Sequence, residues 1–128
     1  MFWLDEIFGG PGLEWPQTEP DAEWRPDLDV FERADGILLC FGVPGLGEDD
    51  IELLLAGDAL IVRGNRDLQA LAGAKPRSLE LPRGRFERRV RLPSSVTTEG
   101  MQTQLTRGLL LVHLPRRDDS VRIRVQHR

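Results

Sequence analysis

The residues with the clearest chemical potential are four arginines in one short segment, Arg85, Arg88, Arg89 and Arg91. They alternate with apolar residues ahead of a Leu-Pro pair at 92–93, so the segment is typical of a β-strand rather than a solvated helix. A guanidinium that is half-buried on a strand needs an acceptor partner. Because such partners in β-proteins often come from another chain, the cluster indicates an assembling binding module.

Residue types that serve catalysis elsewhere form no catalytic pattern in this chain. His113 lies within an apolar strand pattern, and neither it nor His127 has a ligand spacing with the single cysteine, Cys40. The serines at 94–95 lack the Gly-x-Ser-x-Gly context of a nucleophile elbow, and the glycines at 42–47 lack a Walker lysine. We therefore expect no enzymatic activity, no metal site and no cofactor.

Charge and composition narrow the classes of partner and compartment. The 128 residues fit one modest domain with extensions, and the net charge of −4 removes the attraction that nonspecific nucleic-acid binding requires. No stretch approaches the ~20 apolar residues of a membrane span, and the N-terminus lacks a targeting pattern, so the cytosol is expected. Cys40, in an apolar run, is expected to be a buried, unreactive thiol, with an intermolecular disulfide as the alternative.

The elements that would position the arginines are short strands. Alternating or continuous apolar residues separated by turn residues predict strands at residues 26–32, 37–43, 51–55, 59–64, 86–92, 101–105 and 109–114. Gly57 and Gly108 are suited to tight turns between consecutive strands. This density of short strands, with one short candidate helix at residues 67–72, predicts an all-β antiparallel sandwich over residues 25–116.

An aromatic arm, residues 1–24, precedes the strands. It holds all three tryptophans among glycines, prolines and acidic residues, and the prolines stop any regular element after one or two turns. These aromatic residues either pack onto the domain or offer adaptable contact surface to other proteins. For the second alternative, the expected client-binding residues are Phe2, Trp3, Leu4, Ile7, Phe8 and Trp15.

A C-terminal tail, residues 117–128, is expected beyond the domain. A charged tether precedes Val121, Ile123 and Val125, which alternate with arginines, so that their side chains face one way in an extended chain. Such a segment can add to an exposed sheet edge and seat alternate side chains in pockets. An ordinary last strand of the same domain is the alternative.

In their order and spacing, these motifs resemble those of the small heat shock proteins of the α-crystallin domain family, bacterial type. The resemblance covers residues 24–115 and the tail, whose residues 121–125 are similar to the family's anchoring motif. The matching segments are residues 26–32 (Pro-Asp-Leu-Asp-Val-Phe-Glu), 43–46 (Val-Pro-Gly-Leu), 60–66 (Leu-Ile-Val-Arg-Gly-Asn-Arg), 84–88 (Gly-Arg-Phe-Glu-Arg), 108–110 (Gly-Leu-Leu), and the Leu-Pro pairs at 92–93 and 114–115. The chain departs from the family pattern at Thr103, where alanine is usual, and at Arg107, where asparagine is usual.

The resemblance implies an immunoglobulin-like β-sandwich and an ATP-independent holdase, which binds partly unfolded client proteins and prevents their aggregation under stress. It implies a homodimer formed by strand exchange between residues 77–81 of one chain and residues 25–32 of its partner. The implied dimer-interface residues are Arg88, Glu80, Arg77, Leu79, Leu28 and Val30. The tail, through Val121, Ile123 and Val125, would build larger homo-oligomers by entering a groove for which we expect the lining Leu53, Leu55, Thr103 and Leu105.

Two other functions remain open at this point. A sandwich of the same shape can serve as an adaptor or co-chaperone that docks one folded partner, or as a structural coat component. The combination of arginine strand, exchange loop and anchoring tail favours the holdase.

The size of the assembly has two alternatives. Because the N-terminal arm is short, a small particle or a dimer alone is the alternative to a large assembly.

Overall fold

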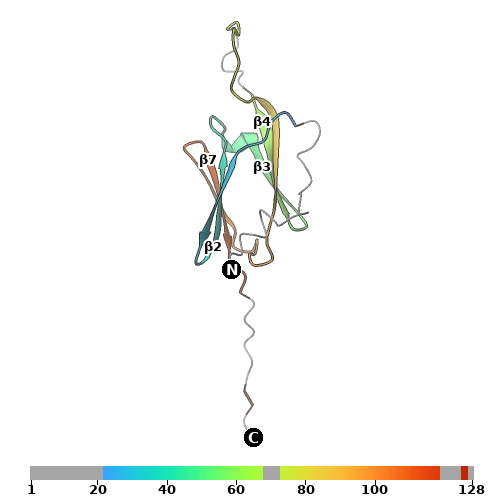
Figure 1. Ribbon diagram of the computed structural model, residues 1–128, viewed down its shortest axis with the longest axis vertical. Coiled ribbons are helices and arrows are strands. Elements are labelled where there is room, and N and C mark those ends of the chain that lie inside the picture. Colours follow the sequence, from blue (N-terminus) through green and yellow to red (C-terminus); the bar gives the residue numbers. More distant parts are fainter. Residues whose placement is uncertain (1–21, 68–72, 119–124, 127–128) are drawn as a thin grey trace, which may run out of the picture.

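The computed structural model describes residues 22–67, 73–118 and 125–126, so the predicted helix at residues 67–72 lies almost entirely outside the described part. Two antiparallel sheets pack face to face (Figure 1). The strands are β1 Leu28–Arg33, β2 Gly36–Gly42, β3 Ile51–Ala56, β4 Ala59–Arg66, β5 Gly84–Arg91, β6 Gln102–Thr106 and β7 Leu109–Pro115, with one 3₁₀ turn, η1 Glu48–Asp50. The predicted antiparallel β-sandwich is confirmed.

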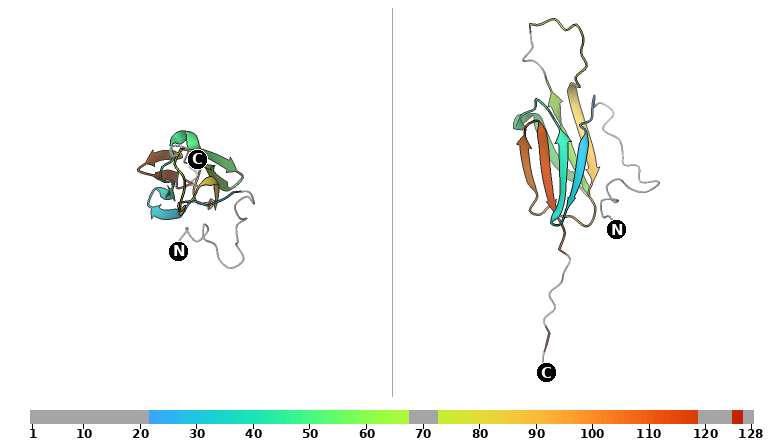
Figure 2. Two further views of the ribbon diagram at one scale, coloured as in Figure 1. Left: turned by 90° about the horizontal axis from the view of Figure 1, so that it is seen from above. Right: turned by 60° about the vertical axis from the view of Figure 1, so that its left-hand side comes forward.

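The strand order determines which sheet edges are open. One sheet has the order β1-β2-β7-β6 and the other has the order β3-β4-β5. Trp24, just before β1, forms a bridge with Phe86 of β5, so the β1 and β5 edges lie on the same side of the sandwich. The β3 and β6 edges therefore lie together on the opposite side (Figure 2).

Alternation of side chains along the strands builds the core between the sheets. On β2, Ile37, Leu39 and Phe41 are fully buried, and the residues between them face outward. Burying a side chain of this size contributes about 1.5–3 kcal/mol relative to leaving it exposed. The other buried members of this core are Val43, Leu60, Val62, Phe86, Val90, Val96, Leu110, Val112 and Leu114.

Cys40 does not lie in this core, and the prediction of a buried thiol is wrong. The residue is only partly buried on the outer face of β2, opposite Asp29 in the register with β1. Partial burial raises the pKa of the Cys40 thiol, and the Asp29 carboxylate raises it further. The thiol therefore stays protonated at neutral pH, which supports the predicted low reactivity.

Gly64 brings three strands together, and we predict that alanine at this position destabilises the fold. Gly64 pairs with Ile51 of β3 and Phe86 of β5, and a Cβ atom there would clash with the carbonyl oxygen of Asp50 and lie 2.7 Å from Cζ of Phe86. Gly64→Ala should lower the free energy of unfolding by about 1–3 kcal/mol, the usual cost of overpacking. Urea denaturation measures this loss. Gly42→Ala is the control, because a Cβ atom added at Gly42 would lie 4.0 Å from the carbonyl oxygen of Asp27 and clash with nothing. Equal losses in the two variants would contradict the argument.

The β6–β7 turn holds a non-glycine residue in the left-handed conformation. Arg107 has φ 50° and Gly108 has φ 78°, the combination that a two-residue type I′ hairpin turn requires. Arg107→Asn should raise the free energy of unfolding by about 1 kcal/mol, because asparagine tolerates this conformation better than arginine does. Thermal melting measures the gain. Arg107→Ala is the control, and a gain of the same size there would assign the effect to the lost charge instead.

Candidate interaction surfaces

Arg88 lies on the inward face of β5, at the side of the sandwich where β1 is open. Its Nη1 donates a hydrogen bond to the carbonyl oxygen of Pro26, at 3.2 Å, just before β1 begins. Burial lowers the pKa of Arg88 and the neighbouring Arg25 lowers it further, whereas Asp27 raises it. Since an arginine remains charged in proteins, a half-buried cation is held beside the start of β1.

The β1 strand ends its sheet, so one of its edges has no neighbour among the described strands. Leu28 and Val30 turn inward and pack partly against the core. Phe31, on the opposite face of β1, is 52% exposed. An open edge of this length is a template for pairing with another strand.

The connection between β4 and β5 projects from one end of the sandwich (Figure 1). In its described part, residues 73–83, the segment carrying Arg77, Leu79 and Glu80 is exposed and contains no strand. Leu79 is 57% exposed and Leu81 is 60% exposed. Two leucines at a spacing of two residues would lie on one face if this segment became extended, which suits pairing with a strand edge.

The four predicted groove residues lie on the two edge strands at the other side of the sandwich. Leu53 and Leu55 share the inward face of β3, and Thr103 and Leu105 share that of β6, because each is paired in register with a buried residue of the neighbouring strand. Leu53 and Leu105 pack against the core, whereas Thr103 is exposed and Leu55 is 49% exposed. The structure thus brings apolar side chains with uncovered surface to two open edges.

The predicted client-binding residues of the arm lie outside the described residues, as do Val121 and Ile123 of the tail. Val125, the one described anchor residue, is 88% exposed. Trp24, which the prediction placed at the end of the arm, packs onto the domain. Its Nε1 donates to the carbonyl oxygen of Gly84 at 3.1 Å, and its ring centroid lies 4.9 Å from that of Phe86.

Arg117 fastens the start of the tail to the domain. Its backbone N–H donates to the carbonyl oxygen of Ser95 at 2.7 Å, its Nε to that of Ser94 at 3.0 Å, and its Nη2 to that of Val96 at 3.3 Å. Sequence reasoning placed this residue in the tether, because hydrogen bonds to backbone carbonyls leave no signal in residue type. The tail therefore leaves the domain from a defined point.

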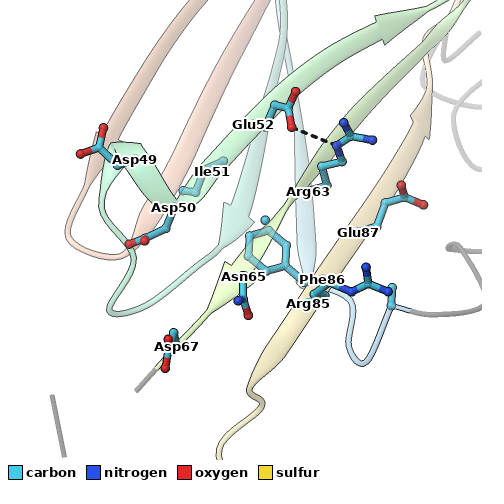
Figure 3. A pocket seen from close by; sticks show the side chains of 12 residues that line it. Asp49, Asp50, Ile51, Glu52, Arg63, Asn65, Asp67, Arg85, Phe86 and Glu87 are labelled. Carbon is cyan, nitrogen blue, oxygen red and sulfur yellow. Dashed lines mark hydrogen bonds and ion pairs between the residues drawn. The ribbon is translucent and has the colours of Figure 1, made fainter. Parts of the chain in front are cut away.

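A hollow of about 560 Å³ on the three-stranded sheet is lined mostly by charged side chains (Figure 3). Within it, Nε of Arg63 lies 3.0 Å from Oε2 of Glu52. Such a lining fits a solvated surface better than an apolar client. In the described ranges, no group of three or more His, Cys, Asp or Glu residues could hold a metal ion.

Comparison with known proteins identifies the family. The sequence model of the Hsp20/alpha crystallin family matches residues 29–127. This chain belongs to that family. The membership confirms the resemblance to small heat shock proteins that the motifs indicated.

This small heat shock protein covers nearly the whole length of some relatives and about half the length of others. The "16.0 kDa heat shock protein, peroxisomal" of Oryza sativa is 30% identical over 136 residues, which cover 95% of this chain and 93% of the relative. The "26.7 kDa heat shock protein, chloroplastic" of the same plant is 27% identical over 125 residues, which cover 88% of this chain and 50% of the relative. The chain thus spans about half the length of that relative.

A solved small heat-shock protein from Xylella fastidiosa superposes with a TM-score of 0.72 at 27% sequence identity. The superposition covers 83% of this chain and 98% of that one, and the Xylella protein is described as having "a distinct high order structure".

No helix among the residues that the structure describes is long and apolar enough to cross a membrane.

Sequence reasoning gave Arg66 no role beyond its place in a family motif. It is 7% exposed at the end of β4, and its Cζ lies 6.0 Å from the centroid of the Trp24 ring. Its Nε is buried without a hydrogen-bond partner. The burial of Arg66 could have been predicted from its spacing along the strand, because residues 60, 62, 64 and 66 share the inward face of β4.

Proposed function

We propose that this small heat shock protein is an ATP-independent holdase, which binds partly unfolded proteins and prevents their aggregation. The observation that carries the proposal is the presence of open, partly apolar edges on both sides of one sandwich, together with an exposed loop that carries two leucines. Membership of the Hsp20/alpha crystallin family supports it. The mechanism is mass action, since binding lowers the free concentration of aggregation-prone chains without any chemical step.

We propose a homodimer formed by strand exchange as the building block. Residues 77–81 of one chain would pair with the open edge of β1 in its partner and satisfy that edge with main-chain hydrogen bonds. Leu79 and Leu81 would join Leu28 and Val30 on the inward face. Arg88, held beside the start of β1, would lie at this interface with Arg77 and Glu80.

We propose that the tail links dimers into larger homo-oligomers. Val121, Ile123 and Val125 would add as a strand along the edges of β3 and β6 and cover the exposed surface of Leu55 and Thr103. Leu53 and Leu105 would form the floor of the groove. The high exposure of Val125 supports this, because an 88% exposed valine gains most from being covered.

The holdase proposal is tested by light scattering of a heat-aggregating model protein, with and without this chain and without ATP. We expect suppression at a near-stoichiometric ratio. If dissociation exposes the binding surfaces, chromatography at increasing temperature should show the mass of the assembly falling as the suppression of aggregation rises. A stable dimer that gives no suppression would contradict the holdase and favour an adaptor for one folded partner.

Removal of residues 1–21 is expected to abolish most of the client protection while the domain keeps its fold. The deletion takes away the aromatic contact residues of the arm and retains Trp24, which packs against Phe86. The scattering assay measures protection, and circular dichroism measures folding. A full-length variant with Glu14→Gln, Glu19→Gln and Asp21→Asn is the control and should protect normally. Equal protection by the truncated chain would move the binding site to apolar surface of the domain, such as Phe31 and Leu109.

We propose the cytosol as the compartment. The single Cys40 cannot form an internal disulfide, so the fold needs no oxidising environment. Relatives described as peroxisomal and chloroplastic belong to other compartments, so fractionation with a tagged chain is the direct test.

A further inference from the structure

The outer face of the three-stranded sheet is more buried than its neighbouring strands account for. On β4, the central strand of this sheet, Ala59, Leu60, Ile61 and Val62 are all buried, so both faces of the strand are covered there. The strand β2 also has a neighbour on each side, but its residues alternate between buried and partly exposed. Continuous burial is typical of strands that are covered on both faces of a sheet.

Ile61 and Glu87 mark the covered part of this outer face. Both point away from the other sheet, because each is flanked along its strand by residues of the core. Ile61 is 8% exposed and Glu87 is 2% exposed. The Arg89 side chain covers part of the carboxylate, with its Nε 3.0 Å from Oε2 of Glu87. No other strand among the described residues packs on this face.

The N-terminal arm joins the domain beside this face. Ala22, the first described residue, borders the hollow between η1 and β5. The next residue follows β5, where the backbone N–H of Glu23 donates to the carbonyl oxygen of Arg85 at 2.7 Å. Trp15 lies seven residues before Ala22 and can be as far as about 25 Å from it. That reach is sufficient, because Ile61 lies only about 13 Å along β4 from residue 65, which also borders the hollow.

Charge also favours the arm as the cover. Residues 1–24 contain no lysine or arginine, and the stretch 13–21 carries three carboxylates. On its outer face β5 carries three arginines against the single carboxylate of Glu87. Asp49 and Asp50 lie across the hollow from β5 (Figure 3), so repulsion directs an acidic segment to the β5 side of the face.

We propose that residues 13–21 of this chain dock on the outer face of β3, β4 and β5 and cover Ile61. Pro16 disfavours a helical conformation for Trp15, and in an extended chain Leu13 and Trp15 share one face. These two side chains would pack on Ile61 and on Leu54, its partner in the register of β3 and β4. The carboxylates of the stretch would lie toward the β5 arginines.

The docked stretch leaves the start of the arm free. Glycines and a proline at residues 9–12 separate it from residues 1–8, which contain five of the six expected client-binding residues. The outer face is thus a docking site for one part of the arm, while another part stays available to clients.

A double-mutant cycle in the full-length chain tests the contact. The equilibrium constant of urea unfolding is measured for Trp15→Ala, Ile61→Thr and the double variant. Two side chains in contact should be coupled by about tenfold in this constant, so the double variant should lose less stability than the two single variants together. Leu38→Thr is the control, because Leu38 points outward from β2 on the other sheet, and its effect should add to that of Trp15→Ala. Additive effects at Ile61, or equal coupling at Leu38, would overturn the proposal.

Disulfide trapping shows which copy supplies the arm, and it remains informative if Ile61→Thr fails to fold. In a Cys40→Ser chain, Leu13→Cys is combined either with Leu54→Cys on the proposed docking face or with Leu38→Cys on the other sheet. We expect the pair with position 54 to oxidise faster and to migrate as a single chain on a non-reducing gel. Migration as a dimer would overturn the assignment to the same chain, and equal rates for the two pairs would overturn the docking itself. Neither readout involves a client, so a negative holdase assay would leave this test intact.

Discussion

Alanine at Val121, Ile123 and Val125 is expected to reduce the assembled protein to dimers. The three substitutions remove seven carbon groups, worth about 6 kcal/mol if all are buried in the groove, at about 0.8 kcal/mol for each methylene. Their loss should leave the strand-exchange interface intact, because that interface uses the opposite side of the sandwich. Size-exclusion chromatography with light scattering gives the mass directly.

The intervening arginines provide the control for this experiment. Arg122→Gln with Arg124→Gln changes the side chains that would face away from the groove, so the particle mass should persist. Thr103→Ala, which restores the alanine usual in the family, should tighten the assembly. A triple-alanine chain with the wild-type particle mass would show that the tail is not the anchor.

Arg88→Ala is expected to destabilise the dimer by about 3–5 kcal/mol, the usual cost of breaking a buried charged interaction by removing one member. The substitution leaves the Pro26 carbonyl oxygen without its donor, and it removes the cation that we place beside the partner's exchanged segment. Dilution in the ultracentrifuge measures dimer dissociation, and thermal melting measures the fold.

The matched control is Arg91→Ala on the same strand. Its Nε lies 3.2 Å from Oδ2 of Asp58 in an exposed pair, so its loss should cost no more than about 1 kcal/mol. If Arg88→Ala keeps both the mass and the melting temperature of the wild type, the residue does not belong to the interface.

The strands were predictable from local pattern because each carries its own alternation and its own turn residue. The hairpin at Gly57 joins β3 Ile51–Ala56 to β4 Ala59–Arg66, where strands were expected at residues 51–55 and 59–64. β4 runs two residues further than its apolar pattern, since Asn65 and Arg66 pair with Arg85 and Gly84 of β5. Cross-strand pairing thus extends a strand beyond its local propensity.

The features missed by sequence reasoning depend on contacts between distant residues. Trp24 reaches the carbonyl oxygen of Gly84, 60 positions along the chain, and Arg117 reaches that of Val96. Every residue has a backbone carbonyl oxygen, so the sequence does not show which one accepts a hydrogen bond, and neither contact could be predicted. The outward orientation of Cys40 was missed because an apolar run does not show which of its residues face the core. The spacing of two residues predicted that Leu53 shares a face with Leu55 and Thr103 with Leu105, as the register of β3 and β6 has them. Their role in binding the tail stays a prediction.

The three hydrogen bonds of Arg117 would limit the volume that the proposed C-terminal anchor can reach. Only three residues lie between this fixed point and Val121, so the first residue of the proposed anchor stays within about 14 Å of the domain surface. A short tether of this kind corresponds to an effective concentration on the order of millimolar. Each contact between a tail and a groove could then be weak on its own and still be occupied most of the time within an oligomer. Single subunits could leave and return while the rest of the oligomer stays together.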